Sequence, residues 1–357
     1  MSRLQRFARA VHGWAGALFT LYLLVISLSG TLLLWKQAYL WLAIPEARAD
    51  FEPTPEALAS IAADIEARFG NRDILQIQFP TEQLALTKVI FPEAHYAYIA
   101  SNGTIIDEWV LNERWEEWLY DLHHRLLLGD QGLSLTGSAG LVLLSLVVLG
   151  LIAFWPLRRG FGRGLWPKSM ARPYSLKAHR NIAILVALPF LLSLITGIVL
   201  AFPGWVEERL RPVRSTQEYS DAMIVGIDDV SGAGTGDWLP AMQRALAGFP
   251  GGTIRTATVP NGFDTYRVLG IQQDVDWHPL GTSQVYIDAP EGYMDVRIDA
   301  TALPRIERAF NAAYPLHTGR LNLPYRLLLT ASGFGLVFAS AFGLLGFLGR
   351  FRVTARL

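Results

Sequence analysis

Four histidines stand at the ends of long apolar runs in this 357-residue chain, where their imidazoles could ligate a metal or a planar cofactor. His12 and His179 each come directly before such a run, and His123 and His317 each lie shortly before another one. A single histidine at a membrane interface usually hydrogen-bonds to water or lipid headgroups. Two matched pairs, one at each end of a helix bundle, instead favour a ligand shared by facing imidazoles.

Haem is the ligand that best suits two facing imidazoles, because its iron accepts axial ligands above and below the macrocycle. Structural zinc needs four ligands, and the chain has no cysteine and no carboxylate close in sequence to His12 or His179. We therefore predict two haem b groups. His12 and His179 (the inner pair) would hold one, and His123 and His317 (the outer pair) would hold the other.

The choice between His123 and His124 rests on two alignments that disagree. Counting back 26 residues from Gly150 reaches His124, just as counting back 26 residues from Gly343 reaches His317. The Leu-His dipeptides instead match His123 with His317. Adjacent helical residues point about 100° apart, so only one of the two can face a given iron. We favour His123 and keep His124 as the alternative.

The basic residues near the histidines have two interpretations, and so do the small ones. Arg125, Arg180 and Arg320 could contact haem propionates, or they could be topology anchors at the membrane surface. Four glycines in or next to the apolar runs could leave room for a porphyrin face, or they could allow close helix packing, which is the commoner cause. These glycines are Gly30, Gly150, Gly197 and Gly343.

The composition indicates a membrane protein, since 51% of the residues are hydrophobic and only 17% are charged. Each of four long apolar runs could cross a hydrocarbon core about 30 Å thick as a helix. The predicted membrane helices cover residues 13–35, 133–155, 181–203 and 324–349. The first run is longer than the core of a signal peptide, which favours an uncleaved anchor.

The formal net charge of zero hides an uneven distribution. The segments 1–12, 156–180 and 350–357 carry 13 basic residues and no acidic ones, and all 31 acidic residues lie in the two long segments between the runs. Short basic loops stay in the cytoplasm. We therefore expect both termini and the basic loop 156–180 to be cytoplasmic, and both long segments to lie outside.

The chain reads as a parallel duplication. The stretches 12–30 and 179–197 both run from a histidine through an apolar segment to a glycine 18 residues later. Each outer segment, 43–120 and 204–316, begins with a helical pattern and continues with alternating strand-like pieces. The expected fold is therefore α-helical in the membrane, with four transmembrane helices and two periplasmic α+β domains.

Four stretches resemble the PepSY-associated transmembrane family, also called iron-regulated membrane proteins. They are RAVHGWAGALFTLYLLVISLSGTLLL, LHHRLLLGDQG, LKAHRNIAILVALPFLLSLITGIVL and PLHTGRLNLPYRLLLTASGFGLV. The resemblance covers nearly the whole chain and implies that both outer domains are PepSY-like. His12, His179, His123 and His317 match the family's histidines. Within the family, the chain is most similar to the FoxB-type dihaem ferrisiderophore reductases.

This resemblance implies a haem-dependent ferric-chelate reductase in the bacterial inner membrane. Electrons would come from the cytoplasmic side or the quinol pool, reduce a ferric siderophore in the periplasm and release Fe(II). No catalytic residue beyond the haem ligands is expected. The chain has no G-x-G-x-x-G motif after a strand, so the electron donor would be a separate protein or a quinol. Membrane lipid is a further expected partner, and nucleic acid is not.

Two other functions are open to such a chain. In the first, the PepSY-like domains bind or regulate a periplasmic partner without catalysis, and the histidines are incidental. In the second, the chain is a permease for chelated iron. The permease is disfavoured because the apolar runs carry no charged residue and only four helices could line a path.

Overall fold

The computed structural model describes residues 2–70, 72–162, 164–210, 223–225, 237–260, 266–288 and 294–351. Parts of the second outer segment and nearly all of the tail 350–357 therefore lie outside the described residues. The chain divides into two compact units. The helical unit comprises Met1–Trp35, Trp118–Val206 and Leu316–Leu357, and the sheet unit comprises Lys36–Glu117 and Glu207–Pro315.

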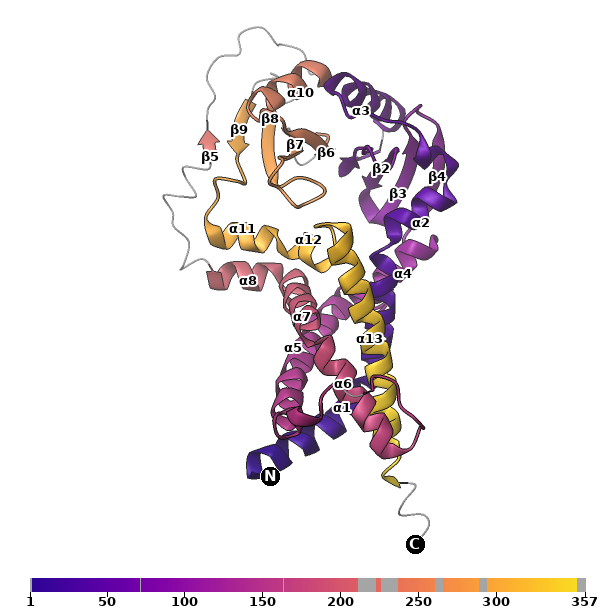
Figure 1. Cartoon of the computed structure of the whole chain (residues 1–357). Coiled ribbons are helices and arrows are strands. Elements are labelled where there is room, and N and C mark those ends of the chain that lie inside the picture. Colours follow the sequence, from indigo (N-terminus) through magenta and orange to yellow (C-terminus); the bar gives the residue numbers. More distant parts are fainter. Residues whose placement is uncertain are drawn as a thin grey trace. The chain divides into compact units, whose positions relative to one another are not determined.

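Within the described residues, three helices are long and apolar enough to cross a membrane: α1 (Arg3–Leu33), α5 (Gly129–Phe154) and α13 (Leu323–Leu348). A fourth crossing requires α6 (Arg172–Leu185) and α7 (Ala187–Ala201) together, and these two helices are bent by 65°. Helix α1 packs against α5 and α13, α6 packs against α13, and α7 packs against α5 (Figure 1).

The bend corrects the expectation of one continuous helix over 181–203. Helix α6 ends at Leu185, and Pro189 lies in the first turn of α7. Proline has no backbone N–H to give to the carbonyl four residues earlier, and its ring clashes with that carbonyl. The carbonyl in question belongs to Leu185, the last residue of α6, so the helix breaks at Val186.

Small and hydroxyl residues make up the buried face of α1, while several of its leucines point outward. Leu18 is 79% exposed and Leu21 is 73% exposed. The buried residues of α1 are Ala8, Thr20, Ser27, Ser29 and Thr31. Several of these hydroxyls donate to the carbonyl four residues earlier, as Thr31 does to Ser27 at 2.6 Å. This inverted pattern is typical of helices that pack through small residues and present leucine to lipid.

Short helices lie between the longer elements along the chain. Two of them carry the outer histidines: α4 (Trp115–Arg125) and α12 (Ala313–His317). The others are α2 (Lys36–Ala43), η1 (Pro45–Arg48), η2 (Pro92–Ala94), η3 (Trp155–Gly160), α8 (Pro203–Leu210) and α11 (Arg305–Asn311).

The sheet unit is built on one antiparallel sheet whose described strands are ordered β4-β3-β2-β1-β6-β7-β8-β9-β5. The first segment supplies β1 (Gln76–Gln78), β2 (Leu86–Phe91), β3 (His95–Ala100) and β4 (Ile105–Val110). The second supplies β5 (Met223–Val225), β6 (Thr253–Ala257), β7 (Tyr266–Gln272), β8 (Ser283–Asp288) and β9 (Met294–Ile298). Apart from β5, these strands lie where the alternating pattern of each segment predicts them.

The two outer segments do not form two separate domains, which corrects the sequence-based expectation. Strand β1 pairs with β6, with Ile77 opposite Ala257, so one sheet runs through both segments. The helices α3 (Pro55–Phe69) and α10 (Trp238–Ala247) contribute to one hydrophobic core, in which Ile65 and Met242 are fully buried. Joining the segments removes two sheet edges and enlarges the core.

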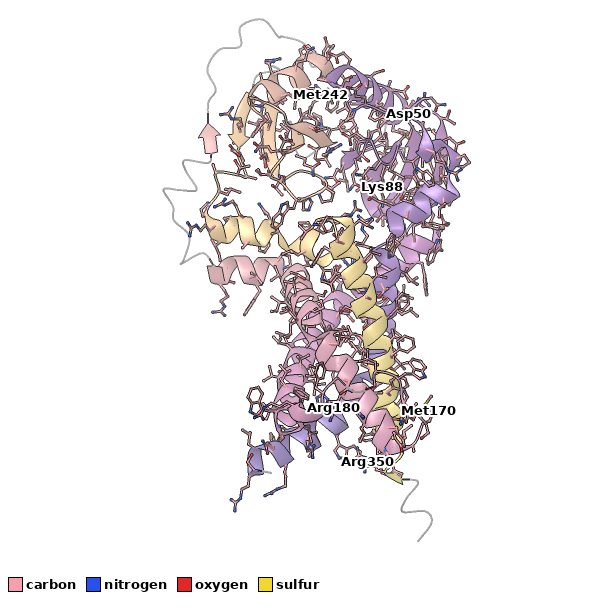
Figure 2. All side chains as sticks on the ribbon, viewed as in Figure 1. Asp50, Lys88, Met170, Arg180, Met242 and Arg350 are labelled. Atoms are coloured by element: carbon pink, nitrogen blue, oxygen red, sulfur yellow. The ribbon has the colours of Figure 1, made fainter. Side chains whose placement is uncertain are left out.

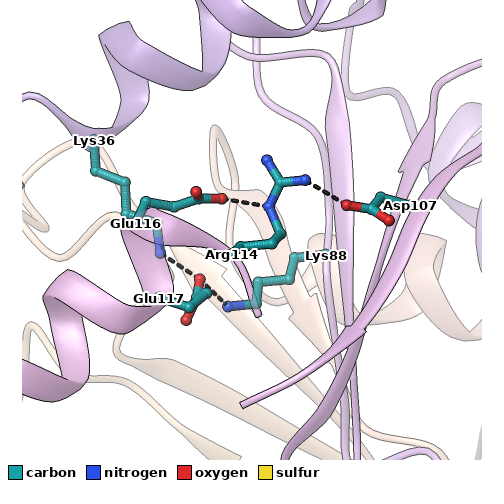
Figure 3. Close-up of polar contacts among 6 residues, drawn as sticks. All are labelled: Lys36, Lys88, Asp107, Arg114, Glu116 and Glu117. Atoms are coloured by element: carbon teal, nitrogen blue, oxygen red, sulfur yellow. Dashed lines mark hydrogen bonds and ion pairs between the residues drawn. The ribbon is translucent and has the colours of Figure 1, made fainter. Parts of the chain in front are cut away.

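Glu117, in the first turn of α4, joins two lysines of the sheet unit (Figure 3). Its Oε1 accepts hydrogen bonds from Lys36 Nζ at 2.6 Å and from Lys88 Nζ at 2.9 Å. Burial alone would raise the pKa of the Glu117 carboxyl, but the two ammonium groups outweigh burial and lower it. Burial, with Lys36 adding repulsion, lowers the pKa of Lys88. The start of α4 is therefore fixed to β2 and α2 by charge.

A second set of ion pairs lies beside the first. Arg114 donates from Nε to Glu116 Oε1 and from Nη1 to Asp107 Oδ2, both at 2.5 Å (Figure 3). Glu116 is almost fully buried, whereas Asp107 is partly exposed on β4. Together the three residues link the first turn of α4 to the edge of the sheet.

Candidate functional site

The inner pair brings together helices α1 and α6. His12 lies on α1 and His179 on α6, and their ring centroids are 6.0 Å apart with an interplanar angle of 53°. Two imidazoles on one metal, each with a metal–nitrogen bond of about 2.0 Å, have centroids roughly 6 Å apart. The inner pair therefore has the spacing of two axial ligands of a single ion.

The outer pair has nearly the same spacing on different elements. His123 lies on α4 and His317 on α12, with ring centroids 6.1 Å apart and an interplanar angle of 45°. All four histidines are partly buried residues. Burial, with His317 and then His124 adding to it, lowers the pKa of His123 to about 3, so this imidazole is neutral, as a ligand must be.

Each of the four rings lies against a glycine of a neighbouring helix. A Cβ atom on Gly150 would stand 3.0 Å from His12, and one on Gly343 would stand 2.8 Å from His179. The corresponding distances are 2.6 Å from Gly30 to His123 and 3.0 Å from Gly197 to His317. The glycines thus make room for the imidazoles themselves, which neither of the two sequence-based readings anticipated.

The same helix turns also hold the rings by hydrogen bonds. His12 Nδ1 donates to the Leu146 carbonyl at 2.9 Å, and His179 Nδ1 donates to the Ala339 carbonyl at 2.7 Å. His317 Nδ1 donates to the Ser193 carbonyl at 3.0 Å. In each case the carbonyl lies four residues before the glycine. His123 hydrogen-bonds to the backbone of Ile26, four residues before Gly30.

This bonding pattern fixes the tautomer of the rings. A carbonyl oxygen only accepts, so Nδ1 must carry the proton, and Nε2 of the neutral imidazole keeps its lone pair. Metal-bound histidines are commonly oriented in this way, with one nitrogen on the metal and the other donating to a carbonyl. Nε2 is therefore the atom available for coordination.

A cavity of about 630 Å³ adjoins the inner pair. Its walls are mostly apolar side chains of α1, α5, α6, α7 and α13, and His12 and His179 both line it. Its basic lining residues are Arg9, Arg172, Lys177, Arg180 and Arg350. Figure 2 labels Arg180 and Arg350 near one end of the helical unit. A cavity of this size and polarity fits an apolar macrocycle with acidic substituents.

A comparison with known families agrees with this architecture. The profile of the PepSY-associated TM region matches residues 9–350, which include all four paired histidines. The chain belongs to this family. No curated protein matches the chain. The family match covers the PepSY-associated proteins as a group, and the closer resemblance to FoxB-type reductases stays a prediction.

The predicted propionate contacts of this PepSY-associated protein differ in their surroundings. Arg180 lines the inner cavity, where its guanidinium donates to the Gly160 carbonyl and to the Asn181 side chain. Arg125 ends α4, and Arg320 follows α12, so both are close in sequence to the outer pair. Arg180 is thus the one of the three that borders a described cavity beside a histidine pair.

His124 lies beside the outer pair in this family member. Its ring centroid is 6.0 Å from that of His123 and 4.1 Å from that of Tyr120. Burial, with His317 and Arg125 adding to it, lowers the pKa of His124 to about 4. His123, by contrast, contacts Gly30 and faces His317. The geometry therefore favours His123 over His124 as the partner of His317.

The remaining histidines of the PepSY-associated chain lie in the sheet unit. His95 contacts the Pro92 carbonyl at 3.4 Å, and the ring of His278 lies 4.8 Å from that of Tyr314. Among the described residues, no group of three or more His, Cys, Asp and Glu could hold a metal ion. The paired histidines are therefore the metal-ligating candidates in the described part of the chain.

Two functional side chains escaped the sequence-based prediction. Ser29 Oγ lies 3.0 Å from His123 Nδ1, and Thr196 Oγ1 lies 3.1 Å from His317 Nδ1. Both residues directly precede a glycine that contacts a histidine, Gly30 and Gly197. The dipeptides Ser-Gly and Thr-Gly at matching repeat positions were the available signal.

Proposed function

We propose that this protein is a dihaem electron-transfer protein that reduces Fe(III) chelates, such as ferric siderophores, outside the bacterial inner membrane and releases Fe(II). The observation that carries the proposal is the repeated geometry of the two histidine pairs. Each pair has a ring separation near 6 Å, and its rings hydrogen-bond to backbone and lie against glycine. A matched arrangement of this kind at two places supports two equivalent bis-histidine sites.

The two histidines of each pair would hold the haem. His12 and His179 would bind through Nε2 at the inner site, and His123 and His317 would do so at the outer site. Haem bound there would supply a one-electron centre on each side of the membrane. Arg9, Arg180 and Arg350 would neutralise acidic substituents at the inner end of the cavity, since they line it together.

Helix α1 sets the separation between the two sites. It carries His12 of the inner pair and Gly30, which contacts His123 of the outer pair. Eighteen residues of α-helix make five turns and rise about 27 Å, so both positions lie on one face of α1. This rise is close to the thickness of the hydrocarbon core, which is about 30 Å, and it therefore supports one site at each membrane face.

The release of iron follows from ligand chemistry. Siderophore oxygens are hard ligands and hold Fe(II) less well than Fe(III), so adding one electron weakens the chelate without any proton transfer. The electron donor would be a quinol or a separate cytoplasmic protein. The basic residues of loop 156–180 fit a cytoplasmic position for that loop.

The visible spectrum of the detergent-purified full chain tests the proposal. We expect a b-type spectrum that sharpens on dithionite reduction, with about two haems per chain, as bis-histidine ligation of two sites requires. The reduced protein should then be reoxidised by a ferric chelate, and a ferrous-iron indicator should report the released Fe(II). A colourless protein from cells with ample haem would contradict the proposal and favour a PepSY protein that binds a periplasmic partner.

A further inference from the structure

The outer pair has a hydroxyl contact at a position where the inner pair has a hydrocarbon side chain. The residue before each contacted glycine is Ser29 or Thr196 at the outer pair. The corresponding residues at the inner pair are Leu149 and Phe342. Two sites with the same ring spacing therefore differ in the groups that surround Nδ1 of their histidines.

At the outer pair, each hydroxyl donates its proton to a backbone carbonyl of its own helix, so it accepts a hydrogen bond from the histidine. Ser29 Oγ donates within its own helix, to the carbonyl of Val25 at 2.7 Å or of Ile26 at 3.2 Å. Its lone pairs are left to accept the Nδ1–H of His123 at 3.0 Å.

Thr196 repeats this arrangement at the other ligand of the outer pair. Its Oγ1 donates to the carbonyl of Leu192 at 2.8 Å or of Ser193 at 3.1 Å. Oγ1 can then accept from His317 Nδ1 at 3.1 Å. Each outer histidine thus shares its Nδ1 proton between a backbone group and a hydroxyl oxygen.

Both hydroxyl groups act in a dry environment. Ser29 is 2% exposed and Thr196 is 5% exposed, so water competes little for their lone pairs. A hydrogen bond in low dielectric is electrostatically stronger than one in water. An added acceptor at Nδ1 increases the electron density at Nε2, and a more basic ligand stabilises the oxidised metal over the reduced metal.

We propose that Ser29 and Thr196 are positioning residues that lower the reduction potential of the outer site relative to the potential it would have without them. This inference rests on the proposed function and adds how the substrate-facing site is adjusted. A ferric chelate with hard oxygen ligands accepts an electron only from a strong reductant. A lowered potential at the outer site makes it such a reductant, whereas the inner site has no hydroxyl at the matching positions.

A redox titration of the detergent-purified full chain, followed by visible and EPR spectra, tests this role. The double variant Ser29→Ala/Thr196→Val should raise the outer midpoint potential by about 59 mV, which is tenfold in a one-electron equilibrium, and leave the inner one unchanged. The variant His12→Ala, which removes an inner ligand, assigns the two steps. Ser29→Thr should keep the outer potential, because it retains the hydroxyl.

Two further variants separate this role from general packing effects. Ser145→Ala removes a serine on α5 that also donates four residues back, to Leu141, and it should move neither potential. Leu149→Ser introduces a hydroxyl at the inner pair and should lower the inner potential.

An unchanged outer potential in the double variant, or an equal shift of both steps, would overturn the inference. So would an unchanged inner potential in Leu149→Ser. These outcomes all require a coloured, haem-loaded protein, so they are distinct from failure of the proposed function, which gives a colourless one.

Discussion

The inner and outer histidine pairs share their ring geometry but differ in how the fold supports them. Ring separations are 6.0 and 6.1 Å, and every ring lies against a glycine. The inner pair comes from α1 and α6, beside a cavity rich in basic residues. The outer pair comes from the short helices α4 and α12, and hydroxyl groups contact it. The same ring geometry is thus kept at both pairs, while the residues around each pair differ.

The largest effect should come from removing one ligand. We expect His12→Ala or His179→Ala to abolish the inner haem alone, and His123→Ala or His317→Ala to abolish the outer haem alone, since a bis-histidine site needs both rings. Haem per chain, measured from the pyridine haemochrome spectrum, should fall from about two to about one. His95→Ala is the control. Loss of both haems from every variant would show that the two sites are not independent.

A smaller effect, specific to the element that carries His123, should follow from Glu117→Gln. This change leaves Lys36 and Lys88 without their carboxylate, and breaking a buried pair costs about 3 kcal/mol or more. Lys36 is 23% exposed, so we expect the loss of stability to be close to the lower value, about 3 kcal/mol. Thermal unfolding should report the loss.

The matched control for Glu117 is Glu108→Gln. Glu108 pairs with Arg72 on the surface, where both side chains are 41% exposed. An exposed pair of this kind contributes about 1 kcal/mol or less. Equal destabilisation by the two variants would contradict a special role for the buried pair.

Glu117 should also make the stability of the sheet unit depend on acid pH. The pKa of its carboxyl is lowered in the folded state below the ordinary value of 4.5. Its stabilising contribution is therefore complete above that value and is lost as the pH falls through the folded pKa. The free energy of unfolding should depend less steeply on pH in the acid range in Glu117→Gln than in the parent protein.

Glycine-to-alanine changes should affect the haem occupancy of the two pairs to different extents. A Cβ would lie 2.6 Å from the ring at Gly30 and 3.0 Å from the ring at Gly150. Overpacking of this kind costs about 1–3 kcal/mol. We expect Gly30→Ala to reduce occupancy of the outer haem more than Gly150→Ala reduces that of the inner haem. Equal losses, measured by haem content, would mean that the rings move aside equally easily.

The smallest effect should come from His124→Leu. The His124 ring lies 4.1 Å from the Tyr120 ring, and His123 is the ring that faces His317, so the outer haem should stay bound with an unchanged reduced spectrum. His123→Leu, the matched change at the next residue, should remove the outer haem. The opposite result would reassign the outer ligand to His124.

Periodic and paired features of the sequence were sufficient to place most elements. The alternating pattern of the outer segments corresponds to strands such as β2 and β7, because alternation of apolar residues indicates directly which face of a strand is buried. The pairing of His12 with His179 also followed from local position, since both begin apolar runs of the same length. Such features depend on nearby residues and can be read without knowing the fold.

Features that depend on distant residues could not be read in this way. The pairing of β1 with β6 depends on two strands in different segments, and nothing in either strand names its partner. The break at Val186 depends on Pro189, which membrane helices often tolerate when neighbours satisfy the freed carbonyl. The glycines were interpreted as sites of helix packing or as room for a porphyrin, because the imidazoles that contact them come from other helices.

The shared sheet has a consequence for biosynthesis. Ile77 finds its partner Ala257 only after a further 180 residues have been made. At 5–20 residues per second, that interval is roughly 10–40 s, during which the edge of β1 has no native neighbour. An unpaired strand edge invites aggregation. The nascent first half therefore needs protection until the second half has been made, and a truncated first half should be a target for quality-control proteases.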